Sequence, residues 1–201
     1  MKKWKHLFKA AVISAVIAMT AVQVCSAAEA GVQNGAAAEV SVLTNEIPGW
    51  PPGPGITSET GVLMDADSGV LLYNKGGDEI RYPASITKIV TTLLACENLN
   101  VKTKITVSEN ASTSVSAGDS SIYAAPGEIF TRDQALMAVM LQSANEMSVA
   151  VAEEVSGSVK KFTELMNWRA KLFGCKNTHF NNPNGLPDEN HYTTASDMAK
   201  I

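Results

Sequence analysis

Cysteine, aromatic side chains and basic charge are all scarce in this sequence. Its 201 residues include three cysteines, aromatic residues make up 6%, and the formal net charge is −4 at pH 7. The only charged residues before position 28 are four lysines, and without these four, 12 of the 16 basic residues remain to face 20 acidic ones. Such a surface does not attract polyanions, so we expect no binding to nucleic acid or to an anionic membrane.

The scarcity of cysteine also limits covalent and metal chemistry. Cys96 and Cys175 lie beyond the N-terminal leader, in sequence typical of helix packing and of a helix end. An exported protein can oxidise such a pair, but these surroundings favour two separate, half-buried thiols. Neither has a second cysteine or a histidine at ligand spacing, so we expect no structural zinc.

The N-terminus predicts export. Residues 1–9 carry the lysines, residues 10–24 are apolar, and small residues suited to a signal peptidase follow. The apolar run is shorter than the roughly 20 residues that span a membrane, which argues against a transmembrane anchor. Cys25 could be the lipid-modified residue of a lipoprotein, but VQVC lacks the small residue expected before it. We predict a signal peptide at 1–27 and a flexible spacer rich in alanine, glycine and proline at 28–55.

Ordered structure should begin after the spacer, since 45% of residues are hydrophobic and 18% charged, as in globular proteins. Two apolar runs around DADSG predict a β-hairpin over 61–74. After Pro83, apolar residues recur at intervals of three and four and predict a helix over 85–98. That helix has almost no charged face, so we expect it to be buried. Lys88 should then be buried or line a cleft, with Ser85 at the helix N-terminus.

Capping patterns predict two more helices. Thr131 and Gln134 form a capping-box pattern before an apolar run. Ser143 and Glu146 repeat it at the start of EMSVAVAEEV, so two helices should meet at the tripeptide SAN. Between the first buried helix and Thr131, residues 105–130 are small and polar, and we expect a long surface connection with short extended pieces.

The last third of the chain predicts a helix, a loop and the start of another helix. The helix over 159–173 should end at Gly174, and Thr193 or Thr194 should cap the final one. In the helix over 159–173, the apolar side chains expected to be buried are Phe162, Leu165, Met166, Leu172 and Phe173.

Ser85 and Lys88 are the first candidates for chemistry. A serine hydroxyl needs a base at neutral pH, and a lysine can serve if burial and neighbouring cations lower its pKa. At positions i and i+3 the two side chains share a helix face, and the helix N-terminus adds N–H groups where an oxyanion would form. The pattern S-x-x-K is common, however, and it also describes a plain capping serine and a lysine that extends to solvent.

Ser143 and Asn145 strengthen the catalytic interpretation. A hydroxyl and an amide on a short turn between two helices could relay a proton to a leaving amine and hydrogen-bond a peptide-like substrate. A capping box that starts the second helix explains the same residues, so both interpretations remain open at this point.

SITK followed by SAN resembles the first two of three motifs shared by penicillin-binding proteins and serine β-lactamases, S-x-x-K, S-x-N and K-T-G. DADSGVLLYNKGGDEIRYPASITKIVT, MLQSANEMSVAVAE and FNNPNGLPDENHYTTASDMA are similar to low-molecular-mass D-alanyl-D-alanine carboxypeptidases. The similarity covers residues 56–201, which we predict to be a partial catalytic domain of that family.

The resemblance implies roles for four residues. Ser85 would attack the carbonyl between the two terminal D-alanines of a peptidoglycan stem peptide, and Lys88 would accept its proton. Ser143 would pass a proton to the departing D-alanine, Asn145 would orient the substrate and Lys88, and water would release the acyl-enzyme. β-Lactams would acylate Ser85 because they mimic the dipeptide.

The resemblance also implies a mixed α/β (α+β) fold of the β-lactamase/transpeptidase type, with a helical cluster packed on an antiparallel sheet. We expect a bacterial cell-envelope enzyme, periplasmic or at the outer face of the cytoplasmic membrane, without metal or organic cofactor. Its partners would be peptidoglycan stem peptides ending in D-Ala-D-Ala, with β-lactams as inhibitors and no nucleic acid.

K-T-G, the third motif, does not occur as such in the 201 residues. In the family it lies on a later sheet strand, and the sequence stops two turns into a predicted helix. We therefore expect a fragment of a longer reading frame, lacking C-terminal strands and any membrane-attaching C-terminal segment.

Two alternatives remain. A serine β-lactamase needs an acidic residue for deacylation, and Asp188 or Glu189 could supply it, although the characteristic flanking sequence is absent. A non-catalytic wall-binding protein, or an inert truncated product, would fit a chain without its third motif. His179 and His191 are too far apart for an i, i+4 metal pair, and we expect both to be loop or rim residues.

Overall fold

The computed structural model of the protein describes residue 45 and residues 47–201. The predicted signal peptide and most of the predicted spacer lie outside these residues, and the boundary at residue 56 remains a prediction. The described part of the spacer, residue 45 and residues 47–55, contains no helix or strand. Within the described residues, no helix is both long and apolar enough to cross a membrane.

The predicted hairpin is confirmed. Strands β1 (Gly61–Met64) and β2 (Leu71–Lys75) pair antiparallel, with Gly61 opposite Lys75 and a register shift after Leu63. The turn is held by the Asp65 carboxylate, which accepts hydrogen bonds from the backbone and side chain of Ser68. Gly69 completes it at φ +71°, a conformation that glycine adopts without steric cost.

The predicted helix is also confirmed, but it is buried on one face only, since Ile86 and Ile89 are 52% and 43% exposed, and its first turn is tighter than an α-helix. A 3₁₀ turn, η1 (Ala84–Thr87), leads into α1 (Lys88–Asn98). Short 3₁₀ segments are common at helix ends because they satisfy backbone groups that the α-helix leaves free. As a result Ser85 lies on the 3₁₀ turn, while Lys88 begins the α-helix.

Residues 105–130 contain more regular structure than expected. Strand β3 (Lys104–Thr106) pairs antiparallel with β4 (Ile129–Thr131), and a short helix, α2 (Glu109–Thr113), lies between them. Ser108 caps α2 by accepting a hydrogen bond from the Ala111 N–H. The predicted short extended pieces are confirmed by these two strands, but α2 was not predicted, and the surface location is wrong for Ile105, Val107 and Ala111, which are buried.

The remaining helices are α3 (Arg132–Leu141), α4 (Asn145–Ser156), α5 (Val159–Leu172) and α6 (Ala195–Met198). The capping box at Thr131 is confirmed, and Thr194 caps α6. Phe162 and Met166 on α5 are fully buried as predicted, but Leu172 is 57% exposed, so its predicted burial is wrong.

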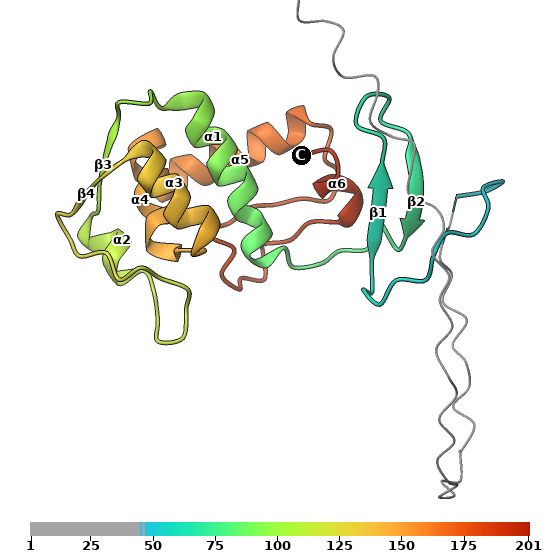
Figure 1. The fold of residues 1–201 in the computed structure, drawn as a ribbon, viewed down its shortest axis with the longest axis horizontal. Helices are drawn as coiled ribbons and strands as arrows, with labels where there is room; N and C mark the ends of the chain where they lie inside the picture. The colour runs from blue at the N-terminus through green and yellow to red at the C-terminus, as the bar shows by residue number, and fades with distance from the viewer. Residues whose placement is uncertain (1–44, 46) are drawn as a thin grey trace, which may run out of the picture. The chain divides into compact units, whose positions relative to one another are not determined.

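Helix α4 is the central element of the helical cluster. It packs against α1, α2, α3 and α5, and its residues 145–152 are all buried. A helix that is buried on every side positions its side chains firmly, since neighbours restrict its movement. Helix α6 packs against β1, next to the hairpin (Figure 1). The mixed helix and antiparallel-strand architecture predicted from the sequence is thereby confirmed.

Candidate active site

Ser85 lies on a turn that is held in a strained shape. The residue before it, Ala84, has φ +48°, a left-handed conformation that is uncommon for residues with a Cβ. Gly185 packs directly against this turn: a Cβ on Gly185 would lie 1.8 Å from the Ala84 carbonyl oxygen. Strain of this kind persists only where surrounding structure enforces it, and it is concentrated at functional sites. Ser85 itself is exposed.

Lys88 is buried as predicted, with 2% of its surface exposed. Its Nζ donates hydrogen bonds to Ser85 Oγ at 3.0 Å, to Asn145 Oδ1 at 2.8 Å and to the Asn184 carbonyl at 2.7 Å. The three hydrogens of the ammonium group thus have three acceptors. The lysine does not extend to solvent.

Burial lowers the pKa of Lys88 from 10.5 to about 8. The cause is loss of solvation, which disfavours the charged form. The negative charges of Asp119 and Glu146 act in the opposite direction and raise it. With a pKa near 8, about one tenth of the amine is neutral at pH 7, and that fraction can accept a proton.

Ser143 does not cap α4, so the predicted second capping box is wrong. The N-cap is Ala144, which makes no side-chain capping bond, and Ser143 has φ +54°. A capping residue needs extended backbone angles, whereas this left-handed turn directs the Ser143 hydroxyl to Ser85. Ser143 Oγ donates to Ser85 Oγ at 3.0 Å. The structure thus brings together all four residues predicted for the site, Ser85, Lys88, Ser143 and Asn145.

Glu146 has a different role from the one expected of a capping-box glutamate. It is 1% exposed, and its Oε1 accepts hydrogen bonds from the Ser121 hydroxyl and the Ile122 N–H, both at 2.7 Å. Among the described residues its Oε2 has no hydrogen-bond partner. Glu146 therefore anchors residues 121–124 beside the site. Sequence reasoning missed this role because the pattern S-x-x-E also describes a cap.

The loop over residues 181–191 supplies the site residue that the sequence did not indicate, Asn184. Its contribution is a backbone carbonyl, which carries no side-chain signal; only the turn-forming dipeptides around it suggested a shaped loop. Next to it, the Pro183 carbonyl accepts a hydrogen bond from Thr91 Oγ1 at 2.6 Å. The loop is therefore fixed along α1.

His191 lies in a loop, as predicted, but it is not an exposed rim residue. It is 2% exposed and contacts the ring of Phe180 edge-on, with ring centroids 5.7 Å apart. Its Nε2 lies 2.7 Å from Thr87 Oγ1, inside the SITK motif. Loop sequence around a histidine cannot show that the loop folds back onto a helix 104 residues earlier.

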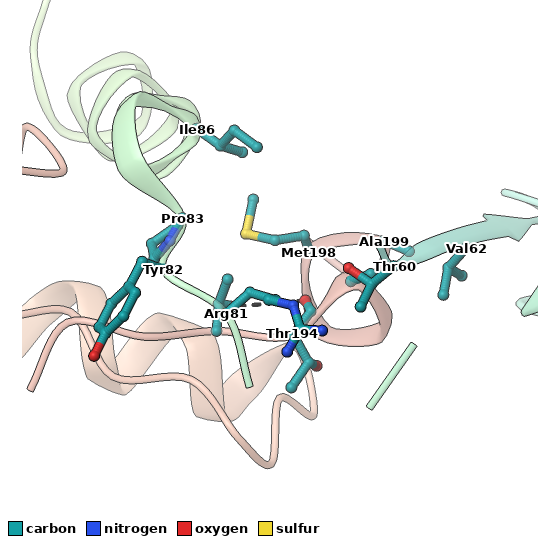
Figure 2. A pocket seen from close by; sticks show the side chains of 11 residues that line it. Thr60, Val62, Arg81, Tyr82, Pro83, Ile86, Thr194, Met198 and Ala199 are labelled. Atoms are coloured by element: carbon teal, nitrogen blue, oxygen red, sulfur yellow. Dashed lines mark hydrogen bonds between the residues drawn. The ribbon is translucent and has the colours of Figure 1, made fainter. Parts of the chain in front are cut away.

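A pocket of about 370 Å³ adjoins the same turn. Figure 2 shows that its lining comes from β1 and its approach, from the segment leading into the turn, and from α6. Ile86, the neighbour of Ser85, is part of that lining. The side chains that surround the pocket are Thr60, Val62, Arg81, Tyr82, Pro83, Ile86, Thr193, Thr194, Ala195, Met198 and Ala199.

Cys96 and Cys175 are separate free thiols, as predicted, but Cys96 is exposed and only Cys175 is half-buried. Over residue 45 and residues 47–201, no three His, Cys, Asp or Glu side chains group closely enough to hold a metal ion.

Comparison with known proteins identifies the family. Residues 48–201 match the family model described as D-alanyl-D-alanine carboxypeptidase, peptidase family S11. The chain is 46% identical over 145 residues to D-alanyl-D-alanine carboxypeptidase DacF of Bacillus subtilis, covering 71% of this chain and 37% of DacF. It is 34% identical over 163 residues to DacA of Escherichia coli K12, covering 77% and 40%.

Solved structures give the same result. The D-alanyl-D-alanine carboxypeptidase DacD of Francisella tularensis aligns with a TM-score of 0.69 and 38% identity, over 75% of this chain and 37% of that one. Penicillin binding protein 5 of Haemophilus influenzae aligns with a TM-score of 0.69 and 35% identity, over 75% and 45%. The chain spans about two fifths of the length of the curated relatives it matches. Its motifs, its fold and these similarities show that the chain belongs to the D-alanyl-D-alanine carboxypeptidase family, peptidase family S11.

Proposed function

We propose that the full-length protein is an exported serine-type D-Ala-D-Ala carboxypeptidase, which removes the terminal D-alanine from peptidoglycan stem peptides through an acyl-enzyme on Ser85. The observation that carries this proposal is the environment of Lys88: a buried amine, 3.0 Å from the hydroxyl of an exposed serine, with a lowered pKa. Membership of the family supports the same activity.

In the first step Ser85 Oγ attacks the carbonyl carbon of the D-Ala-D-Ala bond, and its proton passes to Lys88. The neutral amine has two hydrogens and one lone pair. Asn145 Oδ1 and the Asn184 carbonyl can only accept, so they hold the two hydrogens and leave the lone pair for Ser85. The arrangement aims the base at the nucleophile before substrate arrives, which removes an orientational cost from the reaction.

In the second step the bond between the carbonyl carbon and the leaving nitrogen breaks. That nitrogen needs a proton, and Ser143, 3.0 Å from Ser85 Oγ, is placed to relay one from Lys88. The terminal D-alanine leaves and the shortened peptide remains as an ester on Ser85. Water then attacks the ester, which releases the peptide carboxylate and restores the Ser85 hydroxyl.

β-Lactams are the proposed inhibitors, since their strained amide would occupy the same position and acylate Ser85. The name of the Haemophilus influenzae structure, penicillin binding protein 5, states such binding for that protein. Export through the predicted signal peptide would place the enzyme at the outer side of the cytoplasmic membrane, where peptidoglycan lies.

The β-lactamase alternative is not favoured. The carboxylate of Asp188 accepts hydrogen bonds from the Asn190 N–H and the Asn181 side chain, so local loop contacts already account for it. The relatives are named as carboxypeptidases, a D-alanyl-D-alanine endopeptidase and a DD-transpeptidase.

The test uses the full-length protein without its signal peptide, incubated with benzylpenicillin and examined by intact mass and peptide mapping. A lasting adduct on the peptide that contains Ser85, together with D-alanine release from a D-Ala-D-Ala peptide, is expected. Ser85→Ala should abolish both, while Ser114→Ala, which changes a serine on α2's C-terminal side, should leave both unchanged. Rapid turnover of penicillin would show a β-lactamase, and labelling of the Ser85→Ala protein would refute the nucleophile assignment.

A further inference from the structure

His191 takes no direct part in the proposed chemistry, but it connects two parts of the site. Its ring is enclosed between the loop over 181–191, to which it belongs, and the start of α1. Nδ1 lies 3.0 Å from the backbone nitrogen of Asn181, at the other end of the loop, and Nε2 lies 2.7 Å from Thr87 Oγ1. One nitrogen therefore closes the loop, and the other attaches it to the SITK motif.

These contacts fix the protonation state of the ring. The Asn181 N–H can only donate, so Nδ1 must present its lone pair. In a neutral imidazole the proton then lies on Nε2, which donates to Thr87 Oγ1. A second proton on Nδ1 would face the Asn181 N–H at 3.0 Å. Burial disfavours the charged ring as well and lowers the pKa of His191 to about 4.

The attachment at Thr87 is one of three between the loop and a single face of the helix. The others are Lys88 Nζ to the Asn184 carbonyl and Thr91 Oγ1 to the Pro183 carbonyl. Of the three, only the contact of His191 joins two buried side chains, and it lies next to Lys88 in the sequence. If it is lost, the bond from Thr91 to the Pro183 carbonyl remains, but the buried side-chain link beside Lys88 is gone.

We propose that His191 is a positioning residue for acylation at Ser85: its Nε2–H bond to Thr87 fixes the loop over 181–191 on α1, and so holds the Asn184 carbonyl against Lys88 and keeps water from that amine. The inference rests on the proposed function, since it concerns how Lys88 acts as a base. His191 touches neither substrate nor the reacting atoms.

The charges around the two groups determine the expected pH response. Asp188 raises the pKa of His191 and His179 lowers it, but burial has the largest effect, so His191 stays neutral at pH 6–9. At Lys88, Asp119 and Glu146 raise the pKa and burial lowers it more. Water that enters along a loosened loop would reduce the effect of burial, and the pKa of Lys88 would rise toward 10.5.

Two polar variants test the contributions of the two ring nitrogens separately. Glutamine places an amide nitrogen near the position of Nε2 and can still donate to Thr87, whereas asparagine places an oxygen near Nδ1 and can still accept from Asn181. In the full-length protein, we would measure the second-order rate constant for acylation by a fluorescent penicillin from pH 6 to 9.5, and Tm. His191→Gln should stay within about threefold of the parent, and His191→Asn should fall by about 10- to 100-fold, a loss typical of misplaced catalytic groups. The pH at which the acylation rate of the His191→Asn protein rises should also be higher than in the parent.

Residue 191 could instead serve packing alone. In that case both variants would lower Tm together, with acylation per folded molecule and the pH profile at parental values, and the inference would be overturned. If neither variant folds, Thr87→Val and Thr87→Ser test the same bond from the other side. The valine variant should then show the slow, shifted profile and the serine variant the parental one; a parental profile for valine would refute the inference. A parent that forms no adduct would refute the proposed function itself, which is a separate result.

Discussion

The backbone carbonyl of Asn184 accepts a hydrogen bond from the side-chain nitrogen of Lys88 at 2.7 Å, although 96 residues separate them. A carbonyl oxygen neither takes up nor loses a proton at neutral pH, so the contact restricts the orientation of the amine without competing for its proton. Any side chain at position 184 can provide this carbonyl, provided that the loop keeps its shape. Function at this site therefore depends on loop geometry as much as on residue type.

Lys88→Arg should abolish acylation while the protein stays folded. Arginine keeps a positive charge but does not lose its proton in proteins, so it cannot accept one from Ser85. The second-order rate of penicillin acylation measures the effect. Lys75→Arg is the matched control, because Lys75 Nζ also donates to two backbone carbonyls, those of Ile56 and Ser58, far from Ser85 in the sequence. Acylation by the Lys88→Arg protein at even a tenth of the parental rate would contradict a role as the base.

Lys88 should make stability rise with pH above about 8. Its pKa is about 8 in the folded protein and 10.5 as the ordinary value, so between these pH values the unfolded chain binds more protons. The free energy of unfolding then increases with pH over this window, and the cost of burying the charged amine is present in full below pH 8. Denaturant unfolding at pH 7, 8, 9 and 10, compared with Lys88→Met, isolates this contribution. Equal pH slopes for the two proteins would show that the pKa of Lys88 is not lowered.

Gly185→Ala should damage the site more than substitution of a glycine with a similar φ elsewhere. At Gly185, φ is +87° and a Cβ would meet the Ala84 carbonyl at 1.8 Å, so the loop or the Ser85 turn must move. Gly174→Ala is the control: φ is +76°, with nothing within 4 Å of the new Cβ.

Both alanine variants should lose more than about 1 kcal/mol of unfolding free energy from backbone strain. Only Gly185→Ala should also slow acylation, by about tenfold or more, as expected for a displaced nucleophile. Equal acylation rates in the two variants would mean that the close approach of Gly185 to Ala84 does not shape the site.

Glu146→Gln should move the rise of the acylation rate to lower pH. The negative charge of Glu146 raises the pKa of Lys88. A neutral residue at position 146 should therefore lower that pKa, so that the neutral amine forms at lower pH. Glutamine Oε1 can keep the hydrogen bonds from Ser121 and Ile122, which limits the structural change.

Glu153→Gln is the matched control on the same helix. Glu153 also accepts hydrogen bonds from two side chains, those of Ser108 and Asn110, and it is not among the charges that shift Lys88. Its profile should match that of the parent. If the pH profile of acylation is the same for Glu146→Gln as for Glu153→Gln, Glu146 acts on the site through packing only.

The sequence predicted the parts of the site that depend on local spacing. The i and i+3 positions of Ser85 and Lys88, and an apolar helix around them, were enough to predict a buried lysine beside a serine, which the structure confirms. For Ser143, residue spacing alone left a cap and a catalytic hydroxyl equally open, because its left-handed backbone conformation has no signature in the residue types of SANE.

The loop over 181–191 lay beyond sequence reasoning for a different reason. His191 is buried because its two ring nitrogens find partners on segments far apart in the sequence, and no local pattern encodes that. The same holds for the pairing of β3 with β4, three residues each. What could be predicted was set by periodicity and caps, and what could not was set by contacts that form only in the folded chain.

The distances in sequence between the partners of Lys88 also bear on when the proposed base is assembled during folding. The lysine and its serine are three residues apart, but Asn145 and Asn184 follow 57 and 96 residues later. Closing such long loops costs chain entropy that is recovered only when the distant contacts form. During synthesis and refolding, we therefore expect a chain that has formed only the first helix to carry Ser85 without its complete set of neighbours. Under the proposed function, penicillin labelling of Ser85 would report when these distant contacts have formed.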